Sequence, residues 1–418
     1  MSKIVIIGNG IAGITAARHI RQLGDNDITV ISAESKYFFS RTALMYVFMG
    51  HMKFDHIQPY ENWFWQKNKI DLLQARVKKL EPGQNHLILD SDEIISYDKL
   101  ILALGSKPRA MLIEGHKLPG VQSLYLKQDL QLMEKNVEGV KQATVVGGGL
   151  IGIEMAEMLH TRGVHVSLIV RENSYWDMVL PKEESEMVNR HIISRGIDLR
   201  LGQSIEKIIG EDHVEKLLLT NGDELNCQML GITIGVEPNI SLLSGLNIDL
   251  NKGVLVDETL KTSIDNIYAV GDCVELRNPP DGRSAIEPIW YSGRMMGETV
   301  ANTVCGEDNV YSPGIWFNSA KFFDLEYQTY GNVPVNAEDG IDSFFWEDVK
   351  HEKSIRLVYN KQKSIVGIVS LGVRLRHEIC DIWISKEASL TFALANLDKI
   401  NFDPEFYNKF EKEVVLSY

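Results

Sequence analysis

Residues 4–13 read IVIIGNGIAG, and residues 143–152 read ATVVGGGLIG. In each stretch an apolar, strand-like run leads directly into a Gly-x-Gly-x-x-Gly pattern that opens a helical segment. The first glycine makes a tight turn, the second lets the backbone approach a pyrophosphate, and the third lets the helix pack closely on the strand. The phosphates then lie at a helix N-terminus, where the dipole favours negative charge. Two copies in one chain predict two bound nucleotides and electron transfer between them.

The residues after each pattern indicate which nucleotide it binds. An expected strand over 27–32 ends shortly before Glu34, where a carboxylate accepts hydrogen bonds from an adenosine ribose. The expected strand over 164–170 ends without an acid and continues as Arg171 and Glu172. Arg171 suits the 2′-phosphate of NADPH and Glu172 the free 2′-hydroxyl of NADH, while a solvated charge pair is equally compatible. The choice between the two coenzymes stays open.

Composition restricts the class of protein. A chain of 418 residues exceeds the size of one hydrophobic core, so two or three domains are expected. The net charge of −14 argues against nucleic acid and anionic membrane surfaces as partners, and no apolar run reaches membrane-spanning length. The four cysteines (Cys227, Cys273, Cys305 and Cys380) show no metal-binding spacing, so no metal site is expected. Together with the absence of a signal peptide, they favour a reducing, cytoplasmic location.

The order of apolar runs predicts an α/β fold with parallel sheets. Strand-rich stretches follow both glycine patterns, at 77–104 and at 204–238, which suggests an internal duplication with the second copy inserted into the first. The run 267–270 is expected to return to the first sheet and to place Gly271 and Asp272 at a strand end, where ligands bind in such sheets. Beyond about Tyr311, a hairpin around 360–363 and a helix over 386–397 predict an α+β domain.

Several further segments carry a family resemblance: YDKLILALG at 97–105, TIGVEPN at 233–239, LKTS at 260–263 and IYAVGD at 267–272. With the two glycine patterns, they make residues 3–315 resemble the FAD-dependent pyridine nucleotide-disulphide oxidoreductase superfamily. Leu104 and Ile234 depart mildly from its usual small or hydroxylated residues. The resemblance implies two Rossmann-like nucleotide-binding domains, one inserted in the other. Residues 1–115 and 241–312 would bind FAD, residues 116–240 NAD(P)H, and residues 313–418 would form a C-terminal interface domain.

The resemblance also assigns site residues by position. Those implied for FAD are Gly8, Gly10, Ile11, Ala12, Gly13, Glu34, Arg41, Ala103, Gly105, Gly271, Asp272, Pro288 and Ile289. Those implied for NADH or NADPH are Gly147, Gly149, Ile151, Gly152, Arg171, Glu172 and Gly235. Two residues are implied to take part in catalysis. Arg41 matches a basic position of rubredoxin reductases and nitrite reductase flavoproteins and would support negative charge on the reduced flavin, unless it is a plain surface arginine. Glu154 would lie near the nicotinamide, unless it is an exposed charge favoured by the helix dipole.

The segment that follows Glu34 restricts the chemistry. Many members of the superfamily carry reactive cysteines there, but residues 37–50 contain none. Because a thiolate is needed to attack a disulphide or a peroxide, these activities are not expected. The expected function is an NAD(P)H-dependent FAD flavoprotein reductase that passes electrons to a small redox protein such as rubredoxin or ferredoxin. An NAD(P)H oxidase, a quinone reductase and a redox-sensing flavoprotein that binds a partner are the alternatives.

Two expectations concern partners. A reductase for an acidic carrier needs a basic docking face, and Arg374, Arg376 and His377 form a small basic cluster that would supply one. The same cluster reads equally as a solvated loop paired with nearby acids. A homodimer is a weak expectation taken from the disulphide-reductase relatives.

Overall fold

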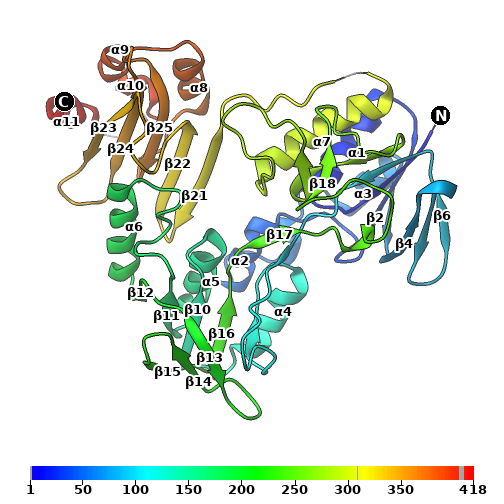
Figure 1. Cartoon of the computed structure of the whole chain (residues 1–418), viewed down its shortest axis with the longest axis horizontal. Helices are drawn as coiled ribbons and strands as arrows, with labels where there is room; N and C mark the ends of the chain where they lie inside the picture. Colours follow the sequence, from blue (N-terminus) through cyan, green and yellow to red (C-terminus); the bar gives the residue numbers. More distant parts are fainter. Residues whose placement is uncertain (1, 308, 404–408) are drawn as a thin grey trace. The chain divides into compact units, whose positions relative to one another are not determined.

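The computed structural model describes residues 2–307, 309–403 and 409–418, which fold into two compact units (Figure 1). Unit 1 consists of Met1–Arg109, Ser123–Lys135 and Gly235–Pro313. Unit 2 consists of Ala110–Gln122, Asn136–Ile234 and Gly314–Tyr418. Each unit is assembled from separate stretches of the chain, and the predicted α/β fold class is confirmed.

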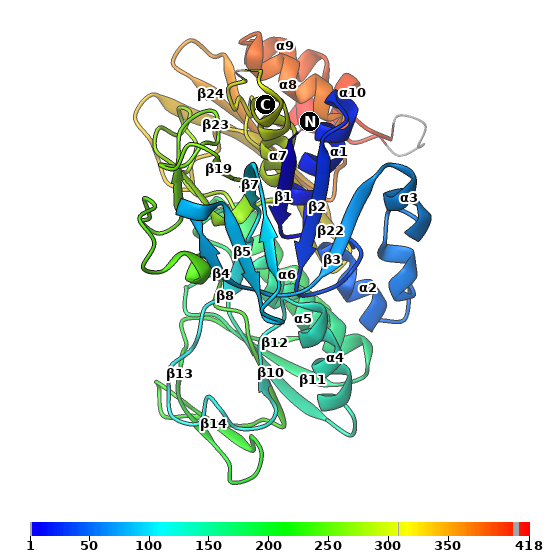
Figure 2. The ribbon, with the colours of Figure 1, turned by 90° about the vertical axis from the view of Figure 1, so that its right-hand side faces the viewer.

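Unit 1 is built on a parallel sheet with the order β19-β7-β1-β2-β3. Its strands are β19 (Ile267–Ala269), β7 (Lys99–Leu102), β1 (Lys3–Ile7), β2 (Asp27–Ser32) and β3 (Ile70–Gln74). Figure 2 shows β7, β1, β2 and β3 side by side. The apolar residues of β1 are buried from both faces, as expected for the central strand of a parallel sheet.

Helices α1 (Ile11–Leu23) and α7 (Trp290–Cys305) pack against each other in unit 1. A Cβ atom placed on Gly297 would lie 2.5 Å from the carbonyl oxygen of Ala12, so a glycine at this position allows the two helices to approach. The remaining helices of unit 1 are α2 (Leu44–Phe48), α3 (Asn62–Lys67) and α4 (Lys127–Asn136), with short 3₁₀ turns η1 (Arg41–Ala43), η2 (Phe54–Ile57), η3 (Pro82–Gln84), η4 (Ser241–Leu243) and η5 (Gly271–Cys273).

Smaller sheets complete unit 1. An antiparallel sheet contains β4 (Val77–Glu81), β5 (His86–Leu89) and β6 (Ile94–Ser96). The antiparallel pair β8 (Ser106–Pro108) and β17 (Val236–Pro238) lies where the chain leaves and re-enters the unit. The parallel pair β18 (Val254–Val256) and β20 (Val274–Leu276) flanks η5.

The central part of unit 2 repeats the pattern of unit 1. Its parallel sheet has the order β12-β11-β10-β16-β9, with β10 in the place of β1. The strands are β12 (Asp198–Arg200), β11 (His165–Ile169), β10 (Gln142–Val146), β16 (Met229–Ile232) and β9 (Val121–Gln122). Helices α5 (Leu150–Thr161) and α6 (Lys182–Ser194) follow β10 and β11, and the antiparallel sheet β13 (Ile205–Ile209), β14 (Lys216–Leu219) and β15 (Glu224–Asn226) corresponds to β4-β5-β6.

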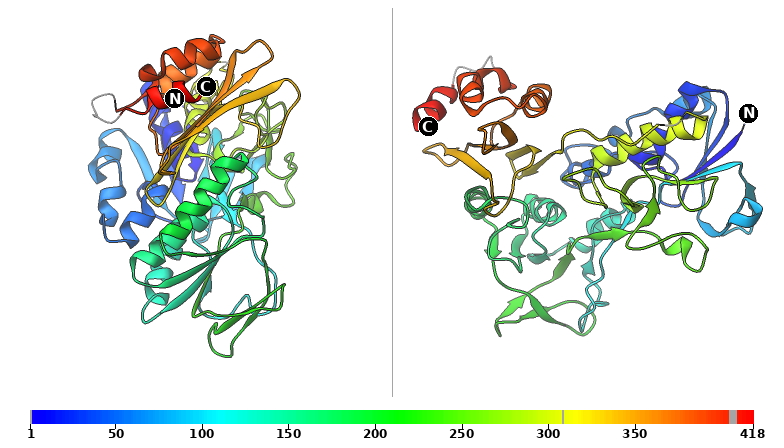
Figure 3. Two further views of the ribbon diagram at one scale, coloured as in Figure 1. Left: turned by 90° about the vertical axis from the view of Figure 1, so that its left-hand side faces the viewer. Right: turned by 45° about the horizontal axis from the view of Figure 1, so that its top comes forward.

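The C-terminal part of unit 2 is an antiparallel sheet with the order β21-β22-β25-β24-β23. Its strands are β21 (Phe317–Phe322), β22 (Leu325–Gly331), β25 (Ile365–Leu371), β24 (Ser354–Asn360) and β23 (Ile341–Glu347). The helices α8 (His377–Ser385), α9 (Leu390–Ala395), α10 (Leu397–Ile400) and α11 (Glu411–Ser417) cover one face, and α6 lies on the other side (Figure 3).

A buried ion pair joins α6 to this sheet. Arg356 on β24 donates to both carboxylate oxygens of Glu184, at 2.7 and 2.9 Å, and to Glu183 at 2.7 Å. The Glu184 side chain is fully buried, and burial raises the pKa of its carboxyl group, against which the charge of Arg356 acts. Such a pair is costly to break because the remaining charge has no partner.

Two sequence-based elements differ in outcome. Strand 27–32 and the hairpin around 360–363 are confirmed by β2 and by the antiparallel pair β24-β25. The single helix expected over 386–397 is wrong. α8 begins earlier and ends at Ser385, Glu387 takes a left-handed φ of 51°, and the Ser389 hydroxyl caps α9 by accepting from the Phe392 N–H. Within the described parts of the chain, no helix is both long and apolar enough to cross a membrane.

Replacing Arg356 with methionine should lower the unfolding temperature of unit 2 by about 6–15 °C, because Glu184 is left buried without a partner. Differential scanning calorimetry measures this. Arg374→Met is the matched control, since Arg374 pairs with Glu326 at the exposed edge of the same sheet. Equal losses in the two variants would contradict a special role for the buried pair.

Candidate nucleotide-binding sites

The first glycine turn joins β1 to α1 in a geometry that only glycine allows. Gly8 has a φ of 113°, and a Cβ atom there would lie 2.0 Å from the carbonyl oxygen of Ala103 at the end of β7. A Cβ atom on Gly13 would lie 2.1 Å from the carbonyl oxygen of Gly8. The first and third glycines are therefore required by the protein's own packing.

The second glycine turn, between β10 and α5, repeats these contacts. Gly147 has a φ of 130°, and its Cβ atom would lie 2.2 Å from the carbonyl oxygen of Thr233, which follows β16. For Gly152 the corresponding distance to the carbonyl oxygen of Gly147 is 2.3 Å. The two turns are thus equivalent in detail, as expected for an internal duplication.

The middle glycines test whether a dinucleotide fits. Gly10 and Gly149 are the N-caps of α1 and α5, with φ values of −70° and −105° that any residue adopts. No heavy atom lies within 4 Å of a Cβ atom built on either residue. Because neither packing nor backbone strain requires glycine here, the open space beside each residue suits a pyrophosphate. No side chain caps either helix, so its first N–H groups are available to phosphate oxygens.

The acid expected at the end of β2 is held by an arginine. Arg41 donates to both carboxylate oxygens of Glu34, at 3.0 and 2.6 Å, and to the carbonyl oxygen of Tyr125. The Lys127 N–H donates to Glu34 at 2.9 Å. Burial opposes the charge of Arg41, but the hydrogen bonds and charge of Glu34 outweigh it and raise the pKa of the guanidinium. Arg41 is therefore committed to the carboxylate that was predicted to bind the ribose.

Asp272 lies close to the same cluster. It follows β19 in η5 and accepts a hydrogen bond of 3.0 Å from the Ser106 hydroxyl. Burial raises the pKa of Asp272, and Ser106 and Arg41 counteract this shift. The neighbouring Gly271 has a φ of 77° and touches the α1 turn, because its Cβ atom would lie 3.0 Å from the Ala12 Cβ. The structure thus brings the predicted residues of β1, β2 and β19 together at one edge of the sheet.

Ser106, Tyr125 and Lys127 were missed by the sequence reasoning. Tyr125 and Lys127 lie 84 and 93 residues from their partners, in the stretch Ser123–Lys135 that packs in unit 1. No motif marks this stretch, and the sequence placed it among the residues expected to bind NAD(P)H. Only the tertiary return of the chain reveals these contacts.

The other residues implied for unit 1 lie at the ends of its elements. Ile11 and Ala12 form the first turn of α1, while Pro288 and Ile289 precede α7 next to the buried Glu287, which accepts from Arg283 and Ser292. Gly105 and Gly235 both have positive φ values and flank the pair β8-β17. Gly235 belongs to unit 1 and not to the unit that carries the second glycine turn.

In unit 2, the predicted charged residues lie beside the second turn. Glu172 has a side chain 24% exposed, and its carboxylate would be 3.7 Å from a Cβ atom on Gly148. Arg171 is 78% exposed and donates to the Glu172 carboxylate at 2.8 and 3.2 Å. The acid therefore lies closer to the turn than the arginine. Ile151 lies in the first turn of α5, beside Gly152.

Glu154 has an unusual environment on α5. Burial raises its pKa from 4.5 to about 7, with Glu157 adding to the shift and Lys321 opposing it. Lys321 comes from β21 and forms an ion pair with Glu157, with N–O distances of 3.1 and 3.3 Å. Glu154 is thus not a simple exposed charge, and a residue of the C-terminal sheet influences its ionisation.

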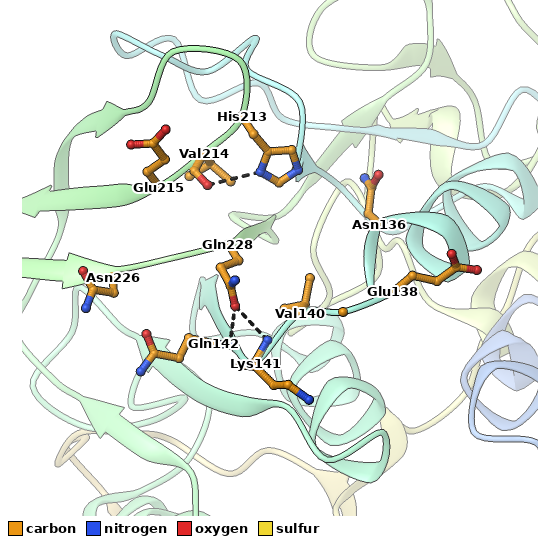
Figure 4. A pocket seen from close by; sticks show the side chains of 11 residues that line it. Asn136, Glu138, Val140, Lys141, Gln142, His213, Val214, Glu215, Asn226 and Gln228 are labelled. Atoms are coloured by element: carbon orange, nitrogen blue, oxygen red, sulfur yellow. Dashed lines mark hydrogen bonds between the residues drawn. The ribbon is translucent and has the colours of Figure 1, made fainter.

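A cavity of about 720 Å³ occurs elsewhere in unit 2 (Figure 4). Its lining includes Lys141, Gln142 and Gln228, which lie at the amino ends of β10 and β16. The Gln228 side chain accepts from the N–H groups of Lys141 and Gln142. Because ligands of such sheets bind at the carboxyl ends of the strands, this cavity is not the expected nucleotide site.

The cysteines occupy apolar surroundings. Cys227, Cys273 and Cys380 are buried, and burial raises the pKa of each thiol, to about 11 for Cys273. Burial also raises the pKa of Cys305, which is partly buried. A raised pKa lowers the thiolate fraction, so these thiols are poorly suited to attack a disulphide.

Comparison with known proteins places the chain in a family. Residues 2–297 match the family model described as pyridine nucleotide-disulphide oxidoreductase. An NADH oxidase of Methanocaldococcus jannaschii is 30% identical over 95% of this chain and 94% of its own length. A rubredoxin-NAD(+) reductase of Pseudomonas putida is 28% identical over 72% of this chain and 80% of its own. A solved structure, an NAD-dependent persulfide reductase from A. fulgidus, has a TM-score of 0.84 and 25% identity, covering 96% of this chain and 80% of its own.

The family match confirms the resemblance that the two glycine patterns indicated. The chain belongs to the pyridine nucleotide-disulphide oxidoreductase family, and it is an FAD-dependent NAD(P)H oxidoreductase.

Proposed function

We propose that this enzyme is a flavoprotein reductase that receives electrons from NAD(P)H and passes them to a small redox protein such as rubredoxin or ferredoxin. The β1–α1 turn of unit 1 would hold FAD, and the β10–α5 turn of unit 2 would hold NAD(P)H. When bound, the two cofactors supply the redox chemistry, a hydride passing from the nicotinamide to the flavin ring. The protein contributes binding, orientation and electrostatics.

For FAD, the proposal assigns separate tasks to three charged residues. Glu34 would accept hydrogen bonds from the adenosine ribose, and Arg41 would hold the Glu34 carboxylate in place through its two hydrogen bonds. This task replaces the earlier expectation that Arg41 supports charge on the flavin ring. Asp272, held by Ser106, would face the ribityl-phosphate part of FAD. The domain boundaries 1–115 with 241–312, 116–240 and 313–418 also stay a proposal.

For the nicotinamide coenzyme, the arrangement favours NADH. The carboxylate of Glu172 lies beside the turn, and the more exposed Arg171 turns back to pair with it. A carboxylate accepts hydrogen bonds from a free 2′-hydroxyl and repels a 2′-phosphate. We therefore propose NADH as the preferred coenzyme, with NADPH as the weaker substrate.

The absence of a thiol relay carries the proposal for the acceptor. Residues 37–50 contain no cysteine, and the pKa of each of the four cysteines is raised. Electrons would then leave for an acceptor that meets the flavin directly. The rubredoxin-NAD(+) reductases among the relatives support a small redox protein in this role. The basic cluster gives little support, since Arg374 is paired with Glu326 and the His377 ring packs on Phe317.

A second candidate is direct transfer to oxygen. The NADH oxidase of M. jannaschii matches nearly the whole of this chain, including the C-terminal part. A quinone reductase and a redox-sensing flavoprotein stay open as weaker alternatives, as does the homodimer. A reducing, cytoplasmic setting is likewise retained as a proposal, because the four cysteines are free.

The acceptor can be identified by reoxidation. Enzyme reduced anaerobically with NADH is mixed with rubredoxin, ferredoxin, a quinone or air-saturated buffer, and return of the flavin band is followed. We expect rubredoxin or ferredoxin to reoxidise the enzyme at least about tenfold faster than air, because no thiol step intervenes. Faster reoxidation by air than by every carrier would contradict the reductase and favour the oxidase.

The two-site assignment predicts opposite defects at the two open glycines. Gly149→Val should fold and keep FAD but lose flavin reduction by NADH by at least about 100-fold, because the side chain fills the pyrophosphate space. Gly10→Val should fold but lose FAD, since both residues have open surroundings and unstrained φ values. Flavin absorbance measures FAD content, and rapid mixing measures reduction. Loss of FAD from Gly149→Val with normal FAD in Gly10→Val would overturn the assignment.

Glu154 is proposed to lie near the nicotinamide, where a carboxyl group with a pKa near 7 changes charge around neutral pH. The neutral acid donates a hydrogen bond and the carboxylate accepts one, so the two forms interact differently with a carboxamide. This property also has a consequence for stability.

Glu154→Gln should become more stable than the wild type as the pH rises. Below pH 4.5 the carboxyl is protonated in both folded and unfolded chains, so it costs nothing; between pH 4.5 and about 7 the folded chain retains a proton that the unfolded chain loses. Wild-type stability therefore falls over this range, and the variant escapes the loss. We expect its lead in unfolding temperature to grow by about 2–8 °C from pH 5 to pH 8. Glu186→Gln, exposed on the neighbouring α6, is the control. A lead that is constant with pH would count against a raised pKa.

A further inference from the structure

A tyrosine hydroxyl binds the backbone of the second glycine turn. Tyr175 lies between β11 and α6, its side chain is fully buried, and its hydroxyl donates to the carbonyl oxygen of Gly149 at 2.6 Å. The same carbonyl accepts from the N–H groups of Gly152 and Ile153, at 3.0 and 3.3 Å. The N-cap carbonyl of α5 is therefore held by a side chain as well as by its own helix.

Tyr175 is itself held by surrounding elements of unit 2. Its N–H donates to the Asn189 side chain at 2.9 Å, and its carbonyl accepts from the Ser185 hydroxyl at 2.7 Å, both on α6. Its ring packs edge-on against Phe322 of β21, with centroids 6.1 Å apart and an interplanar angle of 84°. Burial raises the pKa of Tyr175 far above its ordinary value, so the phenol stays protonated and keeps its hydrogen to donate.

The hydrogen bond fixes the orientation of one peptide group. A trans peptide is planar, and its C=O and N–H point in opposite directions. Because the Gly149 carbonyl points to Tyr175 and into the helix, the N–H of Leu150 points away from Tyr175. The first N–H groups of α5 are those that a phosphate at this turn contacts. Holding the carbonyl thus prepares the Leu150 N–H in advance, without a loss of backbone freedom when the ligand binds.

The first glycine turn has no such device. The carbonyl oxygen of Gly10 accepts from the N–H of Ile14 at 3.0 Å. No side chain among the described residues donates to it. The duplication therefore keeps the glycines but differs in the support of the N-cap, and the second turn gains a bond that reaches it through a residue braced by the C-terminal sheet.

We propose that Tyr175 is a positioning residue for the nicotinamide coenzyme, in which its hydroxyl fixes the Gly149–Leu150 peptide for contact with the coenzyme's pyrophosphate. The proposal rests on the assignment of NAD(P)H to the β10–α5 turn. It gives the C-terminal strand β21 a part in coenzyme binding, since Phe322 supports the Tyr175 ring.

The test uses the FAD-loaded full chain and ADP-ribose, which carries the pyrophosphate but no nicotinamide. Isothermal titration calorimetry compares the wild type with Tyr175→Phe, which removes only the hydroxyl. We expect the Kd of ADP-ribose to rise about tenfold, the effect of one buried hydrogen bond, with FAD content unchanged. Tyr327→Phe is the matched control, because Tyr327 is a buried tyrosine of the same aromatic cluster, packed against Trp176 and Phe322, and not bonded to the turn.

The outcomes separate the two levels of the argument. If the wild-type holoenzyme does not bind ADP-ribose, the assignment of the second turn fails, and the inference fails with it. If the wild type binds but Tyr175→Phe has the same Kd, the assignment stands and Tyr175 only packs. Equal weakening in Tyr175→Phe and Tyr327→Phe also overturns the positioning role, because it indicates a general loss of packing. A weaker Kd confined to Tyr175→Phe supports it.

Discussion

The fold depends on the close approach of a helix N-terminus to the ends of two parallel strands, repeated at two places in the chain. At each place a glycine carbonyl and a neighbouring strand leave no room for a Cβ atom, at Gly8 and Gly13 in one copy and at Gly147 and Gly152 in the other. This approach leaves the next N–H groups directed at the open space beside Gly10 and Gly149. The steric requirement and the binding capacity are therefore consequences of the same backbone geometry.

The C-terminal sheet belongs to the same compact unit as the second turn, and its contacts explain why. The Arg356–Glu184 pair fixes α6 on the sheet, Lys321 reaches Glu157 on α5, and Phe322 supports Tyr175. These bonds connect a region without a nucleotide-binding motif to the helix that begins at the motif. Changes in the C-terminal sheet are accordingly expected to affect the proposed coenzyme site as well as stability.

Local patterns predicted much of this, because the glycine turns and the parallel strands are encoded by adjacent residues. The duplication was visible in the same way. What the sequence did not reveal are contacts made by distant segments, such as Tyr125 and Lys127 on the Arg41–Glu34 cluster and Tyr175 on Gly149. The helix expected over 386–397 failed for a local reason, since the Ser389 cap and the left-handed Glu387 interrupt an otherwise helical composition.

The central claim is that electrons enter at the second glycine turn and reach a flavin held at the first. Anaerobic rapid mixing of the FAD-loaded protein with NADH or NADPH, followed at the flavin absorbance band, tests it most directly. The account predicts a yellow protein that bleaches within seconds and does so faster with NADH. A protein that cannot be loaded with FAD, or a flavin that neither coenzyme reduces, would contradict it.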